Sequence, residues 1–312
     1  MKQARIVTLV GGTGFIGKYV VKRLAEQGFT LRVISRDPEG ALHLKTSGNV
    51  GQVVLQYGDL AKPQTLEHLL AGSCAVINMV GILFERGRQN FSAIHAQGAE
   101  KLAKMSKAAG VQRFIHISSL GVDKAAAKYA KTKFLGEKAT LAAFPEATIL
   151  RPGVVFGPED NFFNQFASLL HRVPAFPLIG GGATRFQPVY VADVAEAILK
   201  VLQDPTTTGK IYELGGPDNV SLKDILAFTA ETIHKKVCFF NLPFPLAALA
   251  GAFAECLPVP PLTRDQVRLL QHDNLVTESM PGFKVLGVQP SSFRLIVPAY
   301  LERFVITQPQ AA

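Results

Sequence analysis

The amino-acid sequence predicts an α/β fold in which a doubly wound, mostly parallel sheet is covered by helices on both faces. Three observations carry this prediction: strand and helix patterns alternate, glycines separate the first strand from the first helix, and the composition changes after residue 157. The first strand is expected over residues 5–10 and the first helix over residues 15–27. Apolar residues recur in this helix at helical spacing before Gly28, a residue suited to ending a helix.

The alternation continues as far as residue 150. Further strands are expected at 31–35, 53–57, 75–80, 113–118 and 148–150, and further helices at 64–70, 91–109 and 125–143. Six strands separated by crossover helices imply a parallel sheet covered on both faces. Right-handed crossovers then give a doubly wound sheet of the Rossmann type. A helix over 193–202 and a strand over 211–214 are expected to return to this sheet.

Proline and phenylalanine become dense after residue 157, and three consecutive glycines interrupt the chain at 180–182. This change predicts two parts. Residues 1–157 with about 189–216 are expected to form the Rossmann domain, and about 158–188 with 217–312 a smaller, C-terminal lobe that closes over the carboxyl edge of the sheet.

Lysine and arginine outnumber aspartate and glutamate by 33 to 24, which gives a formal net charge of +9. Such an excess favours anionic partners: nucleotide phosphates, an acidic protein surface or anionic lipid. The basic residues are scattered, with no run longer than the pair Lys235 and Lys236, so nucleic acid is not an expected partner. The longest apolar stretch, 239–259, contains Asn241, Glu255 and three prolines. It is too broken for a simple membrane span but suits contact with a membrane surface.

The three cysteines form no Cys-x-x-Cys pair, and we expect small buried groups in a reducing compartment at Cys74, Cys238 and Cys256. The first five residues lead directly into a strand, so no signal peptide is expected. The expected location is therefore the cytoplasm or the equivalent of the mitochondrial matrix, with peripheral attachment to the inner membrane as a further option.

A glycine-rich loop lies between the first strand and the first helix. It comprises Gly11, Gly12, Thr13, Gly14, Phe15, Ile16 and Gly17. Gly11 permits a tight turn, Gly14 lets the backbone approach a diphosphate, and Gly17 allows helix and strand to pack closely. Because the start of the helix offers unpaired N–H groups and a partial positive charge, the loop predicts a dinucleotide cofactor.

Arg36 follows the second strand, where the adenosine ribose of such a cofactor would lie. An acid at this place holds the 2′-hydroxyl of NAD(H), whereas an arginine suits the 2′-phosphate of NADP(H). Asp37 is the alternative acid if the strand ends one residue later. NADP(H) is therefore favoured over NAD(H). Asp59 follows the third strand and either accepts a hydrogen bond from the adenine amino group or closes an Asx turn. Leu60 and Val80 complete the expected cofactor site.

Tyr129 and Lys133 lie one helical turn apart on one face of the expected helix. An ammonium group at this distance lowers the pKa of a phenol, so that tyrosine acts as an acid or base near neutral pH, and also holds the nicotinamide ribose. Ser119 closes the preceding strand, where its hydroxyl would polarise a substrate carbonyl, with Ser118 behind it. A hydrogen bond to local backbone is the alternative for either serine.

Other polar residues have simpler interpretations. Asp193 and Glu196 form a capping-box pattern at the start of a helix. His95 is expected to pack or to form a local hydrogen bond. The seven histidines show no metal-ligand spacing, so no metal is expected.

Several strings then carry a resemblance. They are residues 10–17, 78–81, 116–119, 129–133, 150–158 and 185–194. Together they resemble the extended short-chain dehydrogenase/reductase superfamily, which includes NAD-dependent epimerases and dehydratases. Residues 158–163, 180–188 and 260–270 are similar to the complex I alpha subcomplex subunit 9 family and its bacterial relatives. In that family the resemblance implies tight NADPH binding, a mainly structural role in respiratory complex I and a link to ubiquinone metabolism.

One departure concerns spacing, because Tyr129 follows Ser119 by only 10 residues (129 − 119). This interval is short for extended enzymes and puts the approach of the two side chains in question.

The motifs and the resemblance together predict three alternative functions. The first is an NADP(H)-binding accessory or assembly protein of a respiratory or quinone-related membrane complex. The second is an active oxidoreductase, epimerase or dehydratase that uses Ser119, Tyr129 and Lys133, and the third is an NADP(H)-sensing regulator.

Overall fold

The computed structural model describes residues 5–87, 89–257 and 260–305. Its main sheet has seven strands, all paired in parallel, in the order β11-β6-β5-β4-β1-β2-β3. The strands are β1 (Ile6–Val10), β2 (Thr30–Ser35), β3 (Val53–Tyr57), β4 (Ala75–Asn78), β5 (Arg113–Ile117), β6 (Thr148–Pro152) and β11 (Ile211–Leu214). The strand order reverses between β1 and β4, so the predicted doubly wound fold is confirmed.

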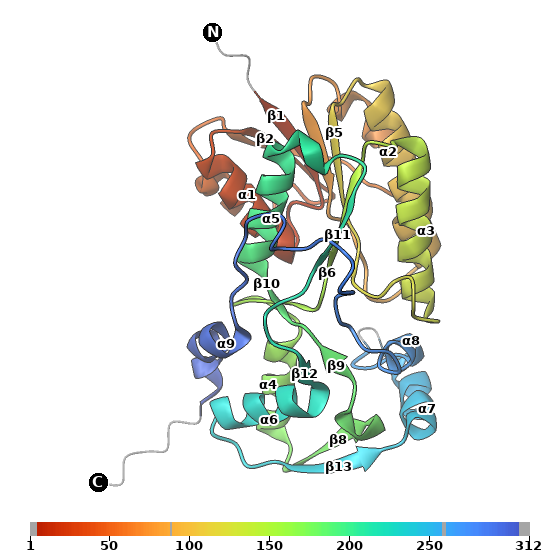
Figure 1. Cartoon of the computed structure of the whole chain (residues 1–312), viewed down its shortest axis with the longest axis vertical. Coiled ribbons are helices and arrows are strands. Elements are labelled where there is room, and N and C mark those ends of the chain that lie inside the picture. Colours follow the sequence, from red (N-terminus) through yellow and green to blue (C-terminus); the bar gives the residue numbers. More distant parts are fainter. Residues whose placement is uncertain (1–4, 88, 258–259, 306–312) are drawn as a thin grey trace, which may run out of the picture.

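Helices cover both faces of this sheet (Figure 1). They are α1 (Phe15–Glu26) and α5 (Val191–Gln203) on one side, and α2 (Ala99–Ala108) and α3 (Lys128–Ala143) on the other. Side chains of alternate residues in β1 point to opposite faces of the sheet and pack in two separate cores. Leu9 packs with α1 and α5, whereas Val10 packs with α2.

The structure corrects three predicted helices. Residues 64–70 form two short 3₁₀ turns, Pro63–Thr65 and Glu67–Leu69, since a segment bounded by Pro63 and Gly72 is too short to sustain an α-helix. The segment 91–109 begins with π-helical turns over Ser92–Gly98 before α2. The helix expected from residue 125 begins only at Lys128.

The remaining elements form the end of the molecule below the sheet in Figure 1. The helices are α4 (Phe163–Arg172), α6 (Leu222–Thr232), α7 (Phe244–Ala254), α8 (Arg264–Leu269) and α9 (Phe293–Leu301). Three two-stranded sheets join β7 (Val155–Phe156) to β10 (Val189–Tyr190), β9 (Arg185–Phe186) to β12 (Val220–Ser221), and β8 (Ala175–Ile179) to β13 (Cys238–Leu242). A third core, rich in phenylalanine, holds α4, α6 and α9 together. The division into a Rossmann domain and a smaller lobe stays a prediction.

The cysteine prediction is wrong in part. Cys238 and Cys256 are exposed and Cys74 is only half-buried. The first two lie on β13 and just after α7, elements that leave one side uncovered. Among the residues described, no helix has the length and apolar character that a membrane crossing requires.

Candidate functional site

The loops after β1, β2, β3 and β4 enclose a groove at the carboxyl ends of these strands, beside the point where the strand order reverses. Its cavity volume is about 500 Å³. Ligands of doubly wound folds bind at such a switch point. Seven of the residues expected to bind a cofactor line it: Gly11, Thr13, Gly14, Arg36, Asp59, Leu60 and Val80.

The glycine loop has a shape that only glycine permits at two positions. Gly11 has a φ of +85°, in the left-handed region, and its carbonyl oxygen accepts the N–H of Gly14 at 3.1 Å. A Cβ at Gly17 would lie 2.5 Å from the carbonyl carbon of Gly12, so the first turn of α1 packs directly on the loop. At Gly14 a Cβ would meet nothing nearer than 3.4 Å. The backbone at Gly14 is therefore open toward the groove that it lines.

The start of α1 leaves its first N–H groups available. The preceding residue, Gly14, provides no side-chain cap, and the first turn contains no acidic residue. Lys18, which donates the first helical hydrogen bond to Gly14, also lines the groove. We did not predict Lys18, although a lysine directly after the third glycine is a signal for positive charge beside a diphosphate. Free N–H groups, the helix dipole and an ammonium group together favour phosphate oxygens.

Four residues of the predicted loop do not line the groove: Gly12, Phe15, Ile16 and Gly17. The Phe15 ring lies edge-on to Tyr19 at 6.0 Å, and Ile16 packs against the core of the sheet. Phe15, Ile16 and Gly17 can therefore offer a ligand only their backbone N–H groups.

Arg36 and Asp37, the two candidates for contact with the ribose, differ in what they already bind. Asp37 closes its own turn, because its Oδ1 accepts the N–H of Gly40 at 2.9 Å. Arg36 is exposed, lines the groove and takes part in none of the ion pairs between described residues. The guanidinium is thus the group of the two that is free for a ligand.

Asp59 forms the Asx turn weighed from the sequence and lies at the groove, while its contact with adenine stays a prediction. Its Oδ1 accepts the N–H of Ala61 at 3.0 Å, which forms an Asx turn, and the residue also lines the groove. Leu60 is buried in the core beneath, where Val80 packs against it. These two side chains form an apolar wall beside a polar carboxylate.

Ser119, Tyr129 and Lys133 meet at the start of α3 despite the short interval between Ser119 and Tyr129. The Ser119 side chain lies close enough to Tyr129 to influence the pKa of its phenol. Lys133 is buried, and its Nζ donates to the carbonyl oxygen of Ile117 at 2.9 Å. A Cβ at Gly81, which lines the groove, would lie 3.4 Å from this Nζ. Lys133 therefore adjoins the groove.

The ionisation of this pair differs from the expectation. Burial raises the pKa of Tyr129, and the nearby Ser119 side chain opposes that rise. Lys133 was expected to lower the pKa of the phenol, but its ammonium is directed at Ile117. Burial lowers the pKa of Lys133 to about 8, with the Glu137 carboxylate opposing. At neutral pH the site therefore holds a protonated phenol beside a charged lysine.

His95 packs and forms local hydrogen bonds, as expected. Its Nε2 accepts the N–H of Ile82 at 3.1 Å, and its Nδ1 lies 3.2 Å from the hydroxyl of Thr132, which itself donates to the helix backbone. The ring stacks on Phe91 and meets Tyr129 edge-on, both at 5.3 Å between centroids. Burial lowers the pKa of His95 to about 3. The imidazole is therefore neutral and packs against the segment that carries Tyr129.

Two buried polar groups lie behind this site. The hydroxyl of Ser118 and Nε2 of His116 have no hydrogen-bond partner among the residues described. The Nδ1 of His116 lies 3.1 Å from the side-chain amide of Asn78. The local backbone bond considered for Ser118 is thus absent from the described hydrogen bonds.

Two carboxylates that the sequence does not single out hold the segment around Tyr129. Asp265, from α8, accepts the backbone N–H groups of Lys128 at 2.7 Å and Tyr129 at 2.8 Å. Glu85 accepts the N–H of Phe91 at 2.8 Å and the Nζ of Lys128 at 2.7 Å. The partners of Asp265 are far away along the chain, so no local pattern marks it.

The capping-box expectation for Asp193 is wrong. Helix α5 begins at Val191 after the N-cap Tyr190, two residues earlier than expected. The Asp193 carboxylate instead accepts the N–H of Ser291 at 2.6 Å. No group of three or more His, Cys, Asp or Glu suited to a metal ion occurs in the described part of the chain.

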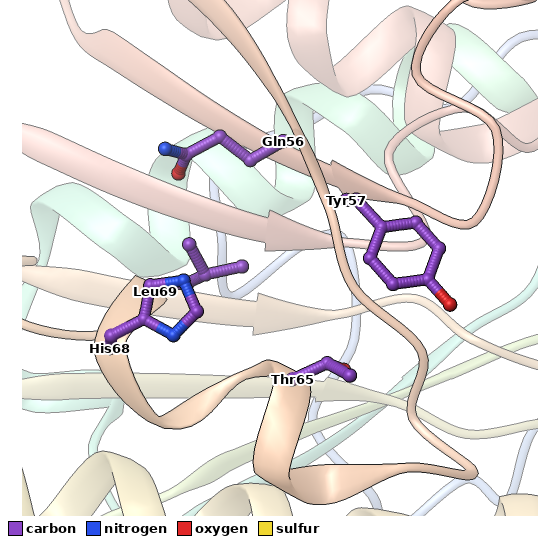
Figure 2. Close-up of a pocket in the computed structure, with 5 residues that line it drawn as sticks. All are labelled: Gln56, Tyr57, Thr65, His68 and Leu69. Carbon is purple, nitrogen blue, oxygen red and sulfur yellow. The ribbon is translucent and has the colours of Figure 1, made fainter.

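A second hollow, of about 390 Å³, lies beside the edge strand β3 (Figure 2). It is lined by Gln56, Tyr57, Thr65, His68 and Leu69. The Thr65 hydroxyl accepts the N–H of Asp59 at 2.9 Å, so the hollow lies behind the Asp59 turn. It contains none of the residues expected to act in catalysis or to bind a cofactor.

Comparison with known proteins agrees with this geometry. The model of the NAD dependent epimerase/dehydratase family matches residues 7–215. The alpha subcomplex subunit 9 of mitochondrial NADH dehydrogenase [ubiquinone] 1 from Arabidopsis thaliana is 35% identical over 302 residues, covering 93% of this chain and 75% of that protein. The ceramide reductase of Caulobacter vibrioides is 30% identical over 254 residues, covering 80% of this chain and 77% of that protein.

Solved structures show the same fold. An NADPH-dependent quinone oxidoreductase from Escherichia coli, complexed with NADPH, has a TM-score of 0.76 at 22% identity, covering 95% of this chain and 99% of that one. The dTDP-glucose 4,6-dehydratase of Streptomyces venezuelae, with NAD bound, has a TM-score of 0.72 at 19% identity, covering 96% of each chain. The resemblance drawn from the motifs is confirmed, and the chain belongs to the NAD dependent epimerase/dehydratase family.

Proposed function

We propose that this chain binds NADP(H) in the groove and acts as an accessory or assembly protein of a respiratory or ubiquinone-related membrane complex. The observation that carries the cofactor choice is Arg36, which lines the groove and pairs with no acid among the described residues, while Asp37 is bound in its own turn. A free guanidinium suits a 2′-phosphate. The amides at the start of α1, with Lys18, would hold the diphosphate, and Lys133 the nicotinamide ribose.

The proposed role at a respiratory complex rests on the relatives. Four proteins that are 32–35% identical over at least 93% of this chain carry names that make them subunits of NADH dehydrogenase or NADH-ubiquinone oxidoreductase. Complex I, or a protein of quinone biosynthesis, is therefore the proposed partner. A peripheral position on the inner membrane, from the cytoplasm or its matrix equivalent, belongs to the same proposal.

Mass spectrometry of the nucleotide released from freshly purified protein tests the cofactor. We expect NADP(H), at close to one molecule per chain if it is held tightly. Calorimetry with all four nicotinamide dinucleotides completes the test, since absence of both bound nucleotide and heat of binding would refute cofactor binding. Absence of the protein from intact complex I of the same cells would refute the partner alone.

A second function is favoured by the assembled Ser119, Tyr129 and Lys133. When bound, the nicotinamide supplies or accepts a hydride. In a reduction, the protonated Tyr129 hydroxyl would give its proton to the substrate carbonyl oxygen, while Ser119 donates a hydrogen bond to that oxygen. Two relatives are named a ceramide reductase and a ketoreductase, which supports a lipophilic carbonyl compound as substrate.

Tyr129→Phe tests this second function. Turnover of a reducible substrate should fall about 100-fold or more, because the general acid is lost. Tyr57→Phe is the matched control, since Tyr57 is an exposed tyrosine outside the groove. Unchanged turnover in Tyr129→Phe would refute the catalytic role and leave NADP(H) binding untouched.

A further inference from the structure

Helix α7 has an apolar side that the described chain does not cover. None of its 11 residues carries a polar or charged side chain. Ala247 and Gly251 are buried, and a Cβ at Gly251 would lie 3.1 Å from the backbone N of Arg264. This side of α7 therefore packs on the start of α8, while the opposite side faces outward.

Large apolar side chains occupy the outward side. Leu246, Leu249 and Phe253 recur at helical spacing and are 56%, 56% and 72% exposed. Leu257, just after the helix, and Phe240, on β13, are similarly exposed at 53% and 49%. Figure 1 shows β13 and α7 together at the end of the molecule far from β1. These five side chains are called the apolar face below.

Positive charges flank the apolar face in the sequence. Four basic residues flank it in the chain: Lys235 and Lys236 before β13, and Arg264 and Arg268 on α8. Only Arg264 among them forms an ion pair with another described residue, at 2.9 Å from Glu255. The other acid between residues 234 and 270, Asp265, is bound to the start of α3. Lys235, Lys236 and Arg268 thus form no ion pair with a described residue, and Arg268 lies on the helix that packs against α7.

We infer that the apolar face docks on an anionic lipid bilayer. At 1.5 Å per residue α7 is roughly 16 Å long, about half of the hydrocarbon thickness, so it would lie in the interface with its apolar side buried. The flanking lysines and arginines would meet anionic headgroups. A symmetric contact with a second copy would instead set like charges against each other.

Docking by this face would bring the membrane close to the catalytic helix. Helix α8 packs on α7 and also supplies Asp265, whose carboxylate holds the N–H of Tyr129. One helix therefore separates the lipid contact from Ser119 and Tyr129. The inference rests on the proposed membrane-associated role. It adds which surface of the protein contacts the membrane and which class of lipid that surface binds.

Vesicle flotation with the full chain tests the inference. The protein should bind phosphatidylcholine vesicles that contain phosphatidylglycerol and should be released by salt, whereas pure phosphatidylcholine should bind it weakly. The double variant Leu249→Ser with Phe253→Ser should lower the vesicle-bound fraction at least about tenfold. Leu295→Ser is the matched control, since Leu295 is 78% exposed on α9, outside the apolar face. NADPH titration of both variants should match the parent protein.

Other outcomes overturn the inference. A parent protein that binds NADPH but no phosphatidylglycerol vesicle contradicts docking and leaves the proposed cofactor function standing. A parent protein that binds these vesicles but not NADPH supports docking and contradicts the proposed cofactor function. Vesicle binding by the double variant at the parent level would show that the apolar face is not the docking surface. A dimer in light scattering that the double variant abolishes, without vesicle binding, would make the face a contact between copies.

Discussion

The carboxylate of Asp265 accepts the backbone N–H of Tyr129 at 2.8 Å, across 136 residues of sequence. Its second oxygen accepts the N–H of the preceding residue, Lys128, at 2.7 Å. Helix α3 has no side-chain cap of its own, because its N-cap is Ala127. A carboxylate from α8 therefore supplies the cap and fixes the backbone that carries the phenol.

Replacing Asp265 by alanine should destabilise the protein by about 1 kcal/mol, the typical loss for an N-cap. Asp265→Asn keeps one acceptor oxygen and should lose less. Urea denaturation measures both, with Glu278→Ala as the control because Glu278 is exposed and makes no described hydrogen bond. Tyrosine absorbance measured against pH reports the ionisation of Tyr129. If Asp265→Ala matches the parent protein both in stability and in this titration, the Asp265 carboxylate does not stabilise the start of α3.

The choice between NADP(H) and NAD(H) should depend on Arg36. Arg36→Ala should weaken NADPH binding roughly 10- to 100-fold, because a charge-assisted contact with the 2′-phosphate is lost. NADH binding should change little. Calorimetry with both nucleotides measures the ratio, and Lys45→Ala, at an exposed lysine that does not line the groove, is the control. Equal losses for the two nucleotides would contradict the assignment of Arg36 to the 2′-phosphate.

Two glycines of the loop should respond differently to alanine. Gly14 is extended and its Cβ would meet no atom within 3.4 Å, so Gly14→Ala should fold with parental stability yet obstruct the groove and weaken NADPH binding at least about tenfold. At Gly17 the Cβ would lie 2.5 Å from the Gly12 carbonyl carbon. Gly17→Ala should therefore cost about 1–3 kcal/mol of stability. Thermal denaturation and nucleotide titration separate the two effects. A destabilised Gly14→Ala would contradict this assignment.

Features specified by short-range signals are predictable from the sequence. The strands at 53–57 and 211–214 have the predicted bounds, since each is a short apolar run between turn residues. The glycine loop and Arg36 are also found this way, because each follows a strand whose end is visible in the sequence. Parallel pairing then brings these loops to one edge of the sheet.

Features created by tertiary contact are not predictable in this way. The π-helical start of the 91–109 segment accompanies a close approach at Gly98, where a Cβ would lie 2.8 Å from Leu60. Asp265 and Asp193 each bind backbone N–H groups about 100 residues or more away. No pattern in the neighbourhood of these residues carries that information. The direction of the Lys133 ammonium toward Ile117 likewise depends on where β5 meets α3.

Stability should fall as the solution becomes acidic, partly through His95. Burial holds its pKa near 3, against 6.5 for the free side chain, so the folded protein favours the neutral ring. The unfolded chain takes up a proton first, and the stabilisation present above pH 6.5 is lost as the pH falls toward 3. Between about pH 7.5 and pH 5 this loss is about 2 kcal/mol.

Urea denaturation at these two values of pH measures the effect. His95→Gln removes the titration and should reduce the loss of stability between them by up to that amount, whatever its own stability at neutral pH. His272→Gln, at an exposed histidine, should leave the loss unchanged. Burial also lowers the pKa of the buried His116. Part of the loss of stability at acidic pH should therefore remain in His95→Gln. If the free energy of unfolding depends on pH identically in His95→Gln and the parent protein, the His95 ring is not held neutral by burial beside Tyr129.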